Sequence, residues 1–231
     1  MGDDDVGVLR RHKYAVLLVM LLATIAIQSV GAGIGPQGIF SDVVTTALGV
    51  AIFLVVFERT HERIPMAMIL LAIVSIGWSR HVLAADLDHP LSIAYQALAA
   101  IFSWIAVGVI LRDLFRTPAI GAENVLGALC GYLIAGNAWT NVNALTYLLA
   151  PAAYGISPPV AVLLADWHGR LALFSYYSLA QMLTIGYADV TPVRAPATTL
   201  SLFGALFGLF YTAVVVSQLV GMAQSGRRER S

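Results

Sequence analysis

The sequence predicts an all-α membrane protein with six transmembrane helices, and a short re-entrant helix with an extended loop between the fifth and the sixth. Three observations lead to this fold class. The chain is 59% hydrophobic and 11% charged, whereas a water-soluble domain carries charge at about a quarter of its positions. Its apolar residues form runs that approach the roughly 17–25 residues needed to cross a bilayer. Its basic residues gather on one side of these runs.

The six apolar runs are long enough, or nearly long enough, to span the hydrocarbon. They are Tyr14–Val30, Val43–Phe57, Ile64–Trp78, Leu91–Leu111, Val125–Leu149 and Ala197–Met222. A seventh run, Leu171–Leu183, is too short for a crossing and suits a re-entrant or interfacial helix. We therefore expect a tail over 1–13, a four-span peripheral domain over 14–116, a second domain over 117–223 and a tail over 224–231.

The basic residues orient this map. With both tails cytoplasmic, only Arg80, Arg170 and Arg194 of the 13 Lys and Arg residues fall outside, as the positive-inside rule requires. Counting Leu171–Leu183 as a crossing would move the arginines of the last tail outside. A cleaved signal peptide over Arg10–Val30 is the alternative for the first span, but its apolar run is longer than usual. We expect the span to be retained and the protein to lie in a bacterial plasma membrane.

Composition also excludes several classes of protein. The formal net charge is zero, so no basic surface is available for a nucleic-acid partner. The one cysteine, Cys130, excludes a disulfide framework and a zinc site built on thiolates. The span interiors hold almost no acid, base or metal ligand, which argues against an enzyme. The expected partner is the lipid bilayer.

The segment from Asp166 carries the most informative pattern. It reads DWHGRLALFSYYSLAQMLTIGYADVTPV and leads into the last span, where Gly208 precedes Tyr211. This order resembles the pore module of tetrameric potassium channels, of the bacterial six-span, voltage-insensitive type. In that family a pore helix leads into T-V/I-G-Y-G-D, then T-P, then an inner helix with a glycine. The resemblance covers about residues 173–221; residues 1–112 resemble the family only in hydropathy.

The resemblance implies a function and its site. Four copies would be needed to enclose an ion, so it implies a homotetramer that conducts monovalent cations, potassium first, without a cofactor. Carbonyl oxygens of Thr184, Ile185, Gly186 and Tyr187 would replace the ion's hydration shell. Gly204 and Gly208 would be hinge or packing positions of the inner helix. The implied filter is Thr184, Ile185, Gly186, Tyr187, Ala188 and Asp189.

Filter geometry explains some of these residues and questions one. In these channels alternate filter residues take positive φ, which Gly186 adopts at little cost, and Tyr187 can pack outward against the pore helix. Ala188 stands where the family has glycine, and alanine at positive φ costs about 1 kcal/mol or more. We expect a strained filter or a rotated outer carbonyl ring, which leaves the selectivity for potassium over sodium open. A weakly selective cation channel and a non-conducting pore-like protein are the alternatives.

Two further classes are weighed against the channel. A transporter with a broken-helix site would show inverted repeats and intramembrane ionisable residues, and we find neither. A voltage sensor needs arginines three apart on one span, but Leu91–Leu111 contains none. Ordinary voltage gating is therefore not expected.

Several polar residues outside the filter have simpler interpretations. We expect Asp166 to cap the re-entrant helix and His168 to anchor it at the interface, with proton sensing by His168 as the sharper alternative. Asn137 is interpreted as a contact from the fifth span to another helix. A loop with Asp86, Asp88 and His89 is expected to be solvated and not to bind metal.

Overall fold

The computed structural model describes residues 13–31, 38–57, 63–79, 81, 88–116 and 122–228. Long helices make up most of this part of the chain. A shorter helix, α8 (Trp167–Met182), lies between the last two of them in sequence. The long helices are α2 (Lys13–Gly31), α3 (Gly38–Val56), α4 (Arg63–Ser79), α5 (Asp88–Arg116), α6 (Ala122–Leu149) and α9 (Ala195–Arg228).

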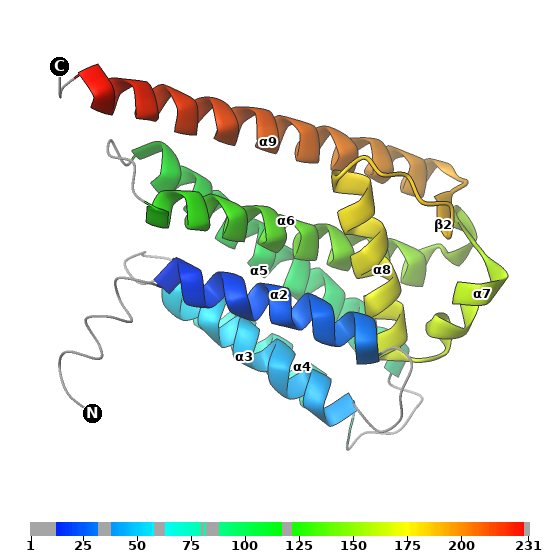
Figure 1. The fold of residues 1–231 in the computed structure, drawn as a ribbon. Helices are drawn as coiled ribbons and strands as arrows, with labels where there is room; N and C mark the ends of the chain where they lie inside the picture. Colours follow the sequence, from blue (N-terminus) through cyan, green and yellow to red (C-terminus); the bar gives the residue numbers. More distant parts are fainter. Residues whose placement is uncertain are drawn as a thin grey trace.

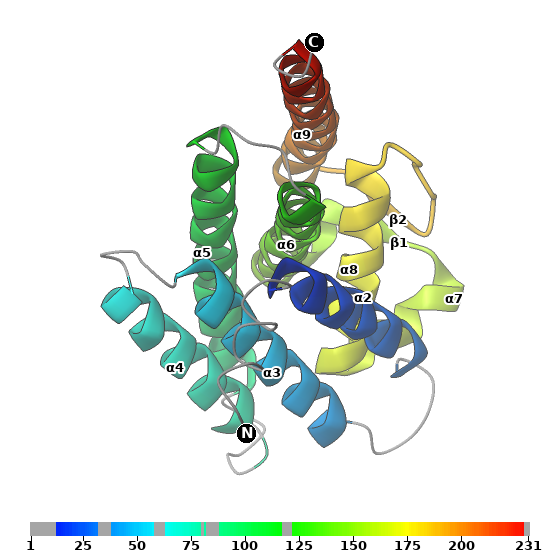
Figure 2. The ribbon, with the colours of Figure 1, turned by 60° about the vertical axis from the view of Figure 1, so that its left-hand side comes forward.

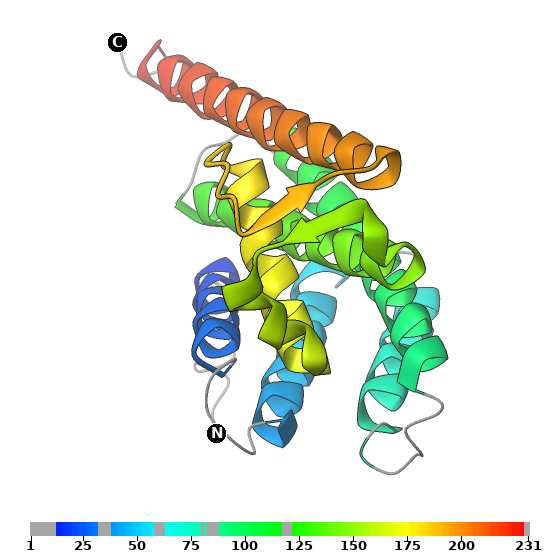
Figure 3. The same ribbon diagram turned by 90° about the vertical axis from the view of Figure 1, so that its right-hand side faces the viewer.

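The segments on either side of α8 are short and irregular. Before it come η2 (Pro151–Ala153), β1 (Tyr154–Ile156), α7 (Pro158–Ala161) and η3 (Val162–Ala165), and after it comes β2 (Val190–Pro192). The strands pair antiparallel, with Tyr154 opposite Pro192 and Ile156 opposite Val190. This ladder, visible in Figure 3, joins the segment that follows α8 to the segment that precedes it.

The helices are arranged around α6. Figure 2 shows α9 on one side of α6, with α3 and α4 on the other. In Figure 1, α8 runs steeply across the direction of α6 and α9, from the region of α2 and α3 to α9. The helix therefore contacts different partners at its two ends.

One apolar core runs through most of the described helices. It extends from Leu17 of α2 to Trp139 of α6 and includes Trp167 and Met182 of α8. The ring of Trp104 on α5 makes edge contacts with Trp139, at 5.5 Å between centroids, and with Phe207 of α9, at 5.1 Å. The helices of the predicted peripheral domain thus pack directly on those of the predicted pore domain, and the boundary at 116/117 stays a prediction.

The all-α membrane fold is confirmed, whereas the number of crossings stays a prediction. Among the described residues, three helices are long and apolar enough to span a bilayer, over Ile39–Val56, His89–Arg116 and Ala195–Val215. Lys13–Gln28 and Arg63–Ser79 are apolar but shorter. Helix α6 is long, but its buried asparagines and threonines lower its hydropathy.

Most helix ends lie close to those predicted. The main differences are that α3 begins at Gly38, not Val43, and that α9 continues past Met222 to Arg228. The re-entrant run predicted over Leu171–Leu183 corresponds to α8, which starts earlier, at Trp167. Hydropathy marks only where a run is apolar, while backbone hydrogen bonding continues into its polar ends.

Candidate functional site

Helix α8 begins at a side-chain cap. Oδ1 of Asp166 accepts a hydrogen bond from the backbone N–H of Gly169 at 2.6 Å. A carboxylate at this position satisfies a free N–H of the first turn and complements the helix dipole. The predicted capping role of Asp166 is confirmed.

The other end of α8 closes with a Schellman motif. The N–H of Ile185 donates to the carbonyl of Ala180 at 2.9 Å, and the N–H of Thr184 donates to that of Gln181 at 3.0 Å. Thr184 takes the left-handed position of the motif, with φ of 56°. Glycine is usual at this position, and a β-branched residue with positive φ is rare. The strain costs about 1–3 kcal/mol and persists because the surrounding hydrogen bonds impose it.

Gly186 repeats the left-handed conformation two residues later, with φ of 73°. Thr184 and Gly186 therefore alternate with residues of negative φ, which is the pattern that the resemblance implies for a filter. Ala188 is not left-handed, because Thr184 is the one non-glycine residue of positive φ in the described chain. The strain expected at Ala188 is found at Thr184, and the alternation ends before the outer end of the loop.

The outer part of the loop is fixed to α8 by an aromatic contact. The ring of Tyr187 stacks on Tyr176, with centroids 5.4 Å apart and planes inclined by 21°. The hydroxyl of Tyr176 donates to Oδ2 of Asp189 at 3.3 Å. The N–H of Ser157 donates to the Asp189 carbonyl at 2.9 Å. Tyr187 thus packs against the helix as expected, and Asp189 is held from two sides.

The loop leaves its opposite side open. Ile185 is 50% exposed and Tyr187 is 53% exposed in the single chain. No atom outside its chain neighbours lies within 4 Å of the point that a Cβ would occupy at Gly186. The backbone of the loop is therefore accessible, as a segment must be whose carbonyls are to meet an ion.

A buried polar network supports α8 from behind. The side-chain N–H of Asn143 on α6 donates to the Ser178 hydroxyl at 2.9 Å, and the carbonyl oxygen of Asn143 accepts from the Tyr154 hydroxyl at 2.9 Å. Asn143 is fully buried. The amide of Gln181 donates to the carbonyls of Leu200 and Ser201, at 3.0 and 2.6 Å. These bonds join α8 to α6, β1 and α9.

The sequence analysis selected the wrong asparagine for this role. Oδ1 of Asn137 accepts from Nδ2 of Asn141 at 2.6 Å, within α6 itself. The contact to the pore-helix position is made by Asn143, which lies further along α6 and faces Ser178. An asparagine in a span signals a hydrogen bond, but only the rotation of α6 against α8 decides which one makes it.

Gly204 and Gly208 are packing positions. A Cβ at Gly204 would overlap the amide of Gln181, and a Cβ at Gly208 would overlap the backbone carbonyl of Met182. Helix α9 is continuous through both positions, from Ala195 to Arg228. Of the two roles predicted for these glycines, the structure shows close approach to α8 and no break at a hinge.

The structure changes the interpretation of His168. Its Nε2 lies 3.1 Å from Oδ1 of Asp42 on α3, a contact that the sequence did not predict, and its anchoring at the interface stays a prediction. The predicted loop around Asp86 lies outside the described residues, and the His89 side chain is exposed. Among the described residues, no cluster of three or more His, Cys, Asp or Glu side chains has the geometry of a metal site.

Sequence reasoning missed Asp42, Asn143 and Tyr154. For Asp42 a signal was present, since an ionisable residue at the edge of an apolar run is a functional candidate. Tyr154 had no local signal, because its hydroxyl partner lies on another element.

Comparison with known proteins bears on the same region. The model of a family described as "Ion channel" matches residues 160–225. No curated protein and no solved structure matches the chain. The matched stretch contains α8, the loop with Thr184 and Gly186, β2 and most of α9. Residues 160–225 are therefore similar to an ion-channel domain, and this similarity supports an ion-channel function for this all-α membrane protein.

Proposed function

We propose that this chain is one subunit of a homotetrameric channel for passive conduction of monovalent cations, potassium first. The carbonyl oxygens of Thr184, Ile185, Gly186 and Tyr187 would hold the ion, and Ala188 and Asp189 would form the outer end of the filter. One observation carries the proposal. An accessible loop with alternating sign of φ follows a short helix inside the segment that matches ion channels.

Electrostatics favour a cation at this loop. The C-terminal end of a helix carries partial negative charge, and α8 ends at Met182, two residues before Thr184. Asp189 adds a carboxylate at the far end of the loop. Backbone carbonyls at membrane depth are tolerated where they line a water-filled cavity, which a pore supplies.

The proposed function requires a ring of subunits, because each chain contributes one such loop. One loop per chain cannot surround an ion, so several copies must meet around an axis, and a heterologous interface that closes supplies such a ring. Exposed apolar side chains on the loop and on the same chain's last helix are available for these contacts. They include Ile185, Tyr187, Leu202, Phe203, Leu209 and Phe210.

The arrangement of the helix ends supports cytoplasmic tails on one side of a bacterial plasma membrane. A Cβ at Gly127, near the start of α6, would contact the ring of Tyr14 in the first turn of α2. The hydroxyl of Tyr211, at the middle of α9, donates to the carbonyl of Ala128 at 2.7 Å. The beginning of α2 and the distal part of α9 thus lie at the same end of α6 (Figure 1).

A weakly selective cation channel is the second candidate. Ala188 is not left-handed, so the alternation that orients successive carbonyls covers Thr184 to Tyr187 only. A filter with fewer aligned carbonyl rings coordinates a dehydrated ion less completely, and discrimination between potassium and sodium depends on that coordination.

Flux through the purified protein in liposomes tests the proposal. We expect potassium flux from a particle that native mass spectrometry shows to contain four chains. Gly186→Ala should abolish the flux, because alanine is strained at φ of 73°. Gly108→Ala is the matched control, since Gly108 has open space around it on α5. A monomeric or dimeric particle without cation flux would contradict the proposal.

A further inference from the structure

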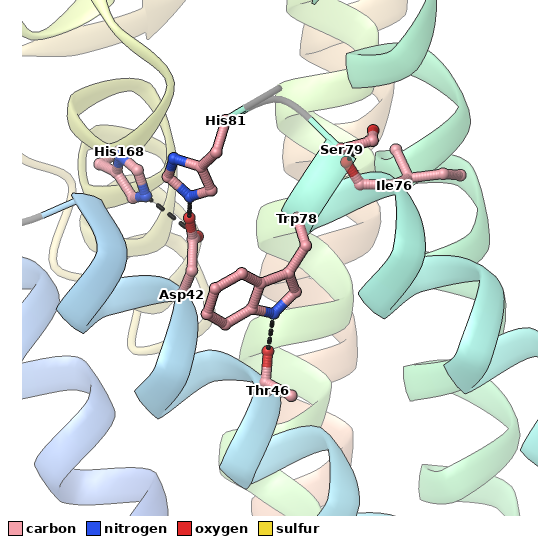
Figure 4. Close-up of polar contacts among 7 residues, drawn as sticks. All are labelled: Asp42, Thr46, Ile76, Trp78, Ser79, His81 and His168. Atoms are coloured by element: carbon pink, nitrogen blue, oxygen red, sulfur yellow. Dashed lines mark hydrogen bonds and ion pairs between the residues drawn. The ribbon is translucent and has the colours of Figure 1, made fainter. Parts of the chain in front are cut away.

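We propose that Asp42, His81 and His168 form a proton-binding latch that fixes the first turn of α8 to α3 and to the end of α4. External protons would be its ligand, and its tightening at acid pH would support the filter. Only the conduction part of this inference depends on the proposed function. Figure 4 shows the two imidazole rings converging on the carboxylate of Asp42.

The geometry uses both carboxylate oxygens. Nε2 of His81 lies 2.8 Å from Oδ2 of Asp42, and Nε2 of His168 lies 3.1 Å from Oδ1. An ionised carboxylate only accepts hydrogen bonds, so each imidazole donates its Nε2–H. Each Nδ1 is then left to take up a proton from water. Protonation converts a neutral donor into an imidazolium facing a carboxylate, and the attraction between opposite charges then adds to the hydrogen bond.

The surroundings of the latch hold few other charges. Asp42 borders a cavity of about 100 Å³ between α2, α3, α4, α5, α6 and α8, and no other described residue that lines it is charged. The ring of Trp78 lies 5.9 Å from that of His81, where an aromatic face attracts a cation. Of the other ionisable groups beside His168 on α8, Asp166 caps the helix and Arg170 lies over the Trp167 ring.

Water can reach the latch. The side chains of His81 and His168 are 34% and 32% exposed, and that of Asp42 is 16% exposed. Histidine is the side chain that proteins most often use as a proton-sensitive switch. Arg80 lies outside the described residues.

The position of the latch couples it to the filter. His168 lies in the first turn of α8, and the same helix ends at Met182, two residues before Thr184. On the other side, the indole N–H of Trp78 donates to the Thr46 hydroxyl at 3.2 Å, which ties α4 to α3 one turn after Asp42. Acidification would therefore hold both ends of a rigid helix, because the far end is already fixed by Gln181 and the Schellman motif.

Thermal unfolding of the purified full-length protein tests the latch without any need for conduction. We compare wild type with His81→Gln, His168→Gln and Asp42→Asn at about pH 8 and about pH 5.5, on either side of the ordinary imidazole pKa. Glutamine keeps an N–H donor but cannot take up a proton. As the pH falls, the difference in Tm between wild type and each variant should change by about 2–4 °C in favour of wild type. His89→Gln, on an exposed side chain, is the control and should follow wild type.

Two further measurements complete the test. Hydrogen exchange of wild type, corrected for intrinsic rates, should show increased protection of residues 167–170 at the lower pH. Potassium flux of wild type in liposomes should be higher with acid outside than with alkali, and this ratio should fall to about one in His168→Gln. Variants whose Tm follows wild type at both pH values would overturn the latch. If the Tm results support the latch but the potassium flux of a conducting channel is the same with acid and with alkali outside, the link between the latch and the filter would be overturned.

Discussion

At Thr184 the backbone carries strain that the sequence analysis assigned to Ala188. The left-handed φ of 56° at a β-branched residue is imposed by the hydrogen bonds to Ala180 and Gln181 that close α8. Ala188 has no comparable bonds to the end of a helix and adopts an unstrained conformation. The steric cost of a Cβ at positive φ is the same at both residues, so their surroundings decide where it is accepted.

Replacing Ala188 with glycine should sharpen potassium preference. Glycine can enter the left-handed region at little cost, which would extend the alternation beyond Gly186 and align a further carbonyl ring. The bi-ionic reversal potential with potassium on one side and sodium on the other measures this change. Ala188→Ser keeps the Cβ and should leave the reversal potential as in the original chain. An unchanged value in Ala188→Gly would show that Ala188 does not limit selectivity.

At the scale of single elements, α8 is held by neighbours on several sides. Gly208 of α9 lies against its last carbonyls, Asn143 of α6 reaches its middle, and Asp42 of α3 contacts its first turn. A transverse helix without such contacts would have no reason to stay fixed relative to the long helices. The loop that follows α8 is therefore positioned by residues that lie far from it in sequence.

Gly208→Ala should weaken the contact between α9 and α8. The added Cβ would overlap the Met182 carbonyl, which is backbone and cannot rotate away. Overpacking of this kind costs about 1–3 kcal/mol, and thermal unfolding measures it. Gly108→Ala adds the same methyl group to α5 in open space and should be neutral or stabilising. Equal stability of the two variants would contradict the close approach of α9 to α8.

Asn143→Leu should destabilise the protein more than Asn137→Leu. The first change leaves the buried hydroxyls of Tyr154 and Ser178 without their amide partner, and each unsatisfied buried group costs about 1–3 kcal/mol. Among the described residues, Asn137 accepts its hydrogen bonds from Asn141 of its own helix. Chemical unfolding in the same detergent compares the two, and a larger loss in Asn137→Leu would refute the assignment.

At the scale of the whole molecule, the charges lie at helix ends. On α5, the charged residues are Asp88 at the start and Arg112, Asp113 and Arg116 near the end. No described helix presents the row of arginines that a transmembrane voltage would move. The helices before α6 instead contact α8 through packing and through Asp42.

Conductance should therefore depend only weakly on voltage. Moving one elementary charge across the membrane is worth about 2.3 kcal/mol per 100 mV, and the described spans hold no such charge away from their ends. Planar-bilayer recordings over both polarities check this. An open probability that changes more steeply than one elementary charge allows would contradict the prediction.

The sequence by itself predicted an all-α membrane protein with an ion-channel-like segment in its last third. Hydropathy and the distribution of arginines were enough to locate the long helices to within a few residues at most ends. Thr184 to Asp189 were identified from local order, because helix, glycine and proline signals act over a few residues.

Only the tertiary structure decided which distant side chains support that loop. The partner of Ser178 is Asn143 and not Asn137, and the partner of His168 is Asp42, which is 126 positions away. The left-handed conformation expected at Ala188 is found at Thr184, because the hydrogen bonds that close α8 impose it there. Each of these outcomes depends on how one helix is rotated and placed against another, and residue order alone does not contain that relation.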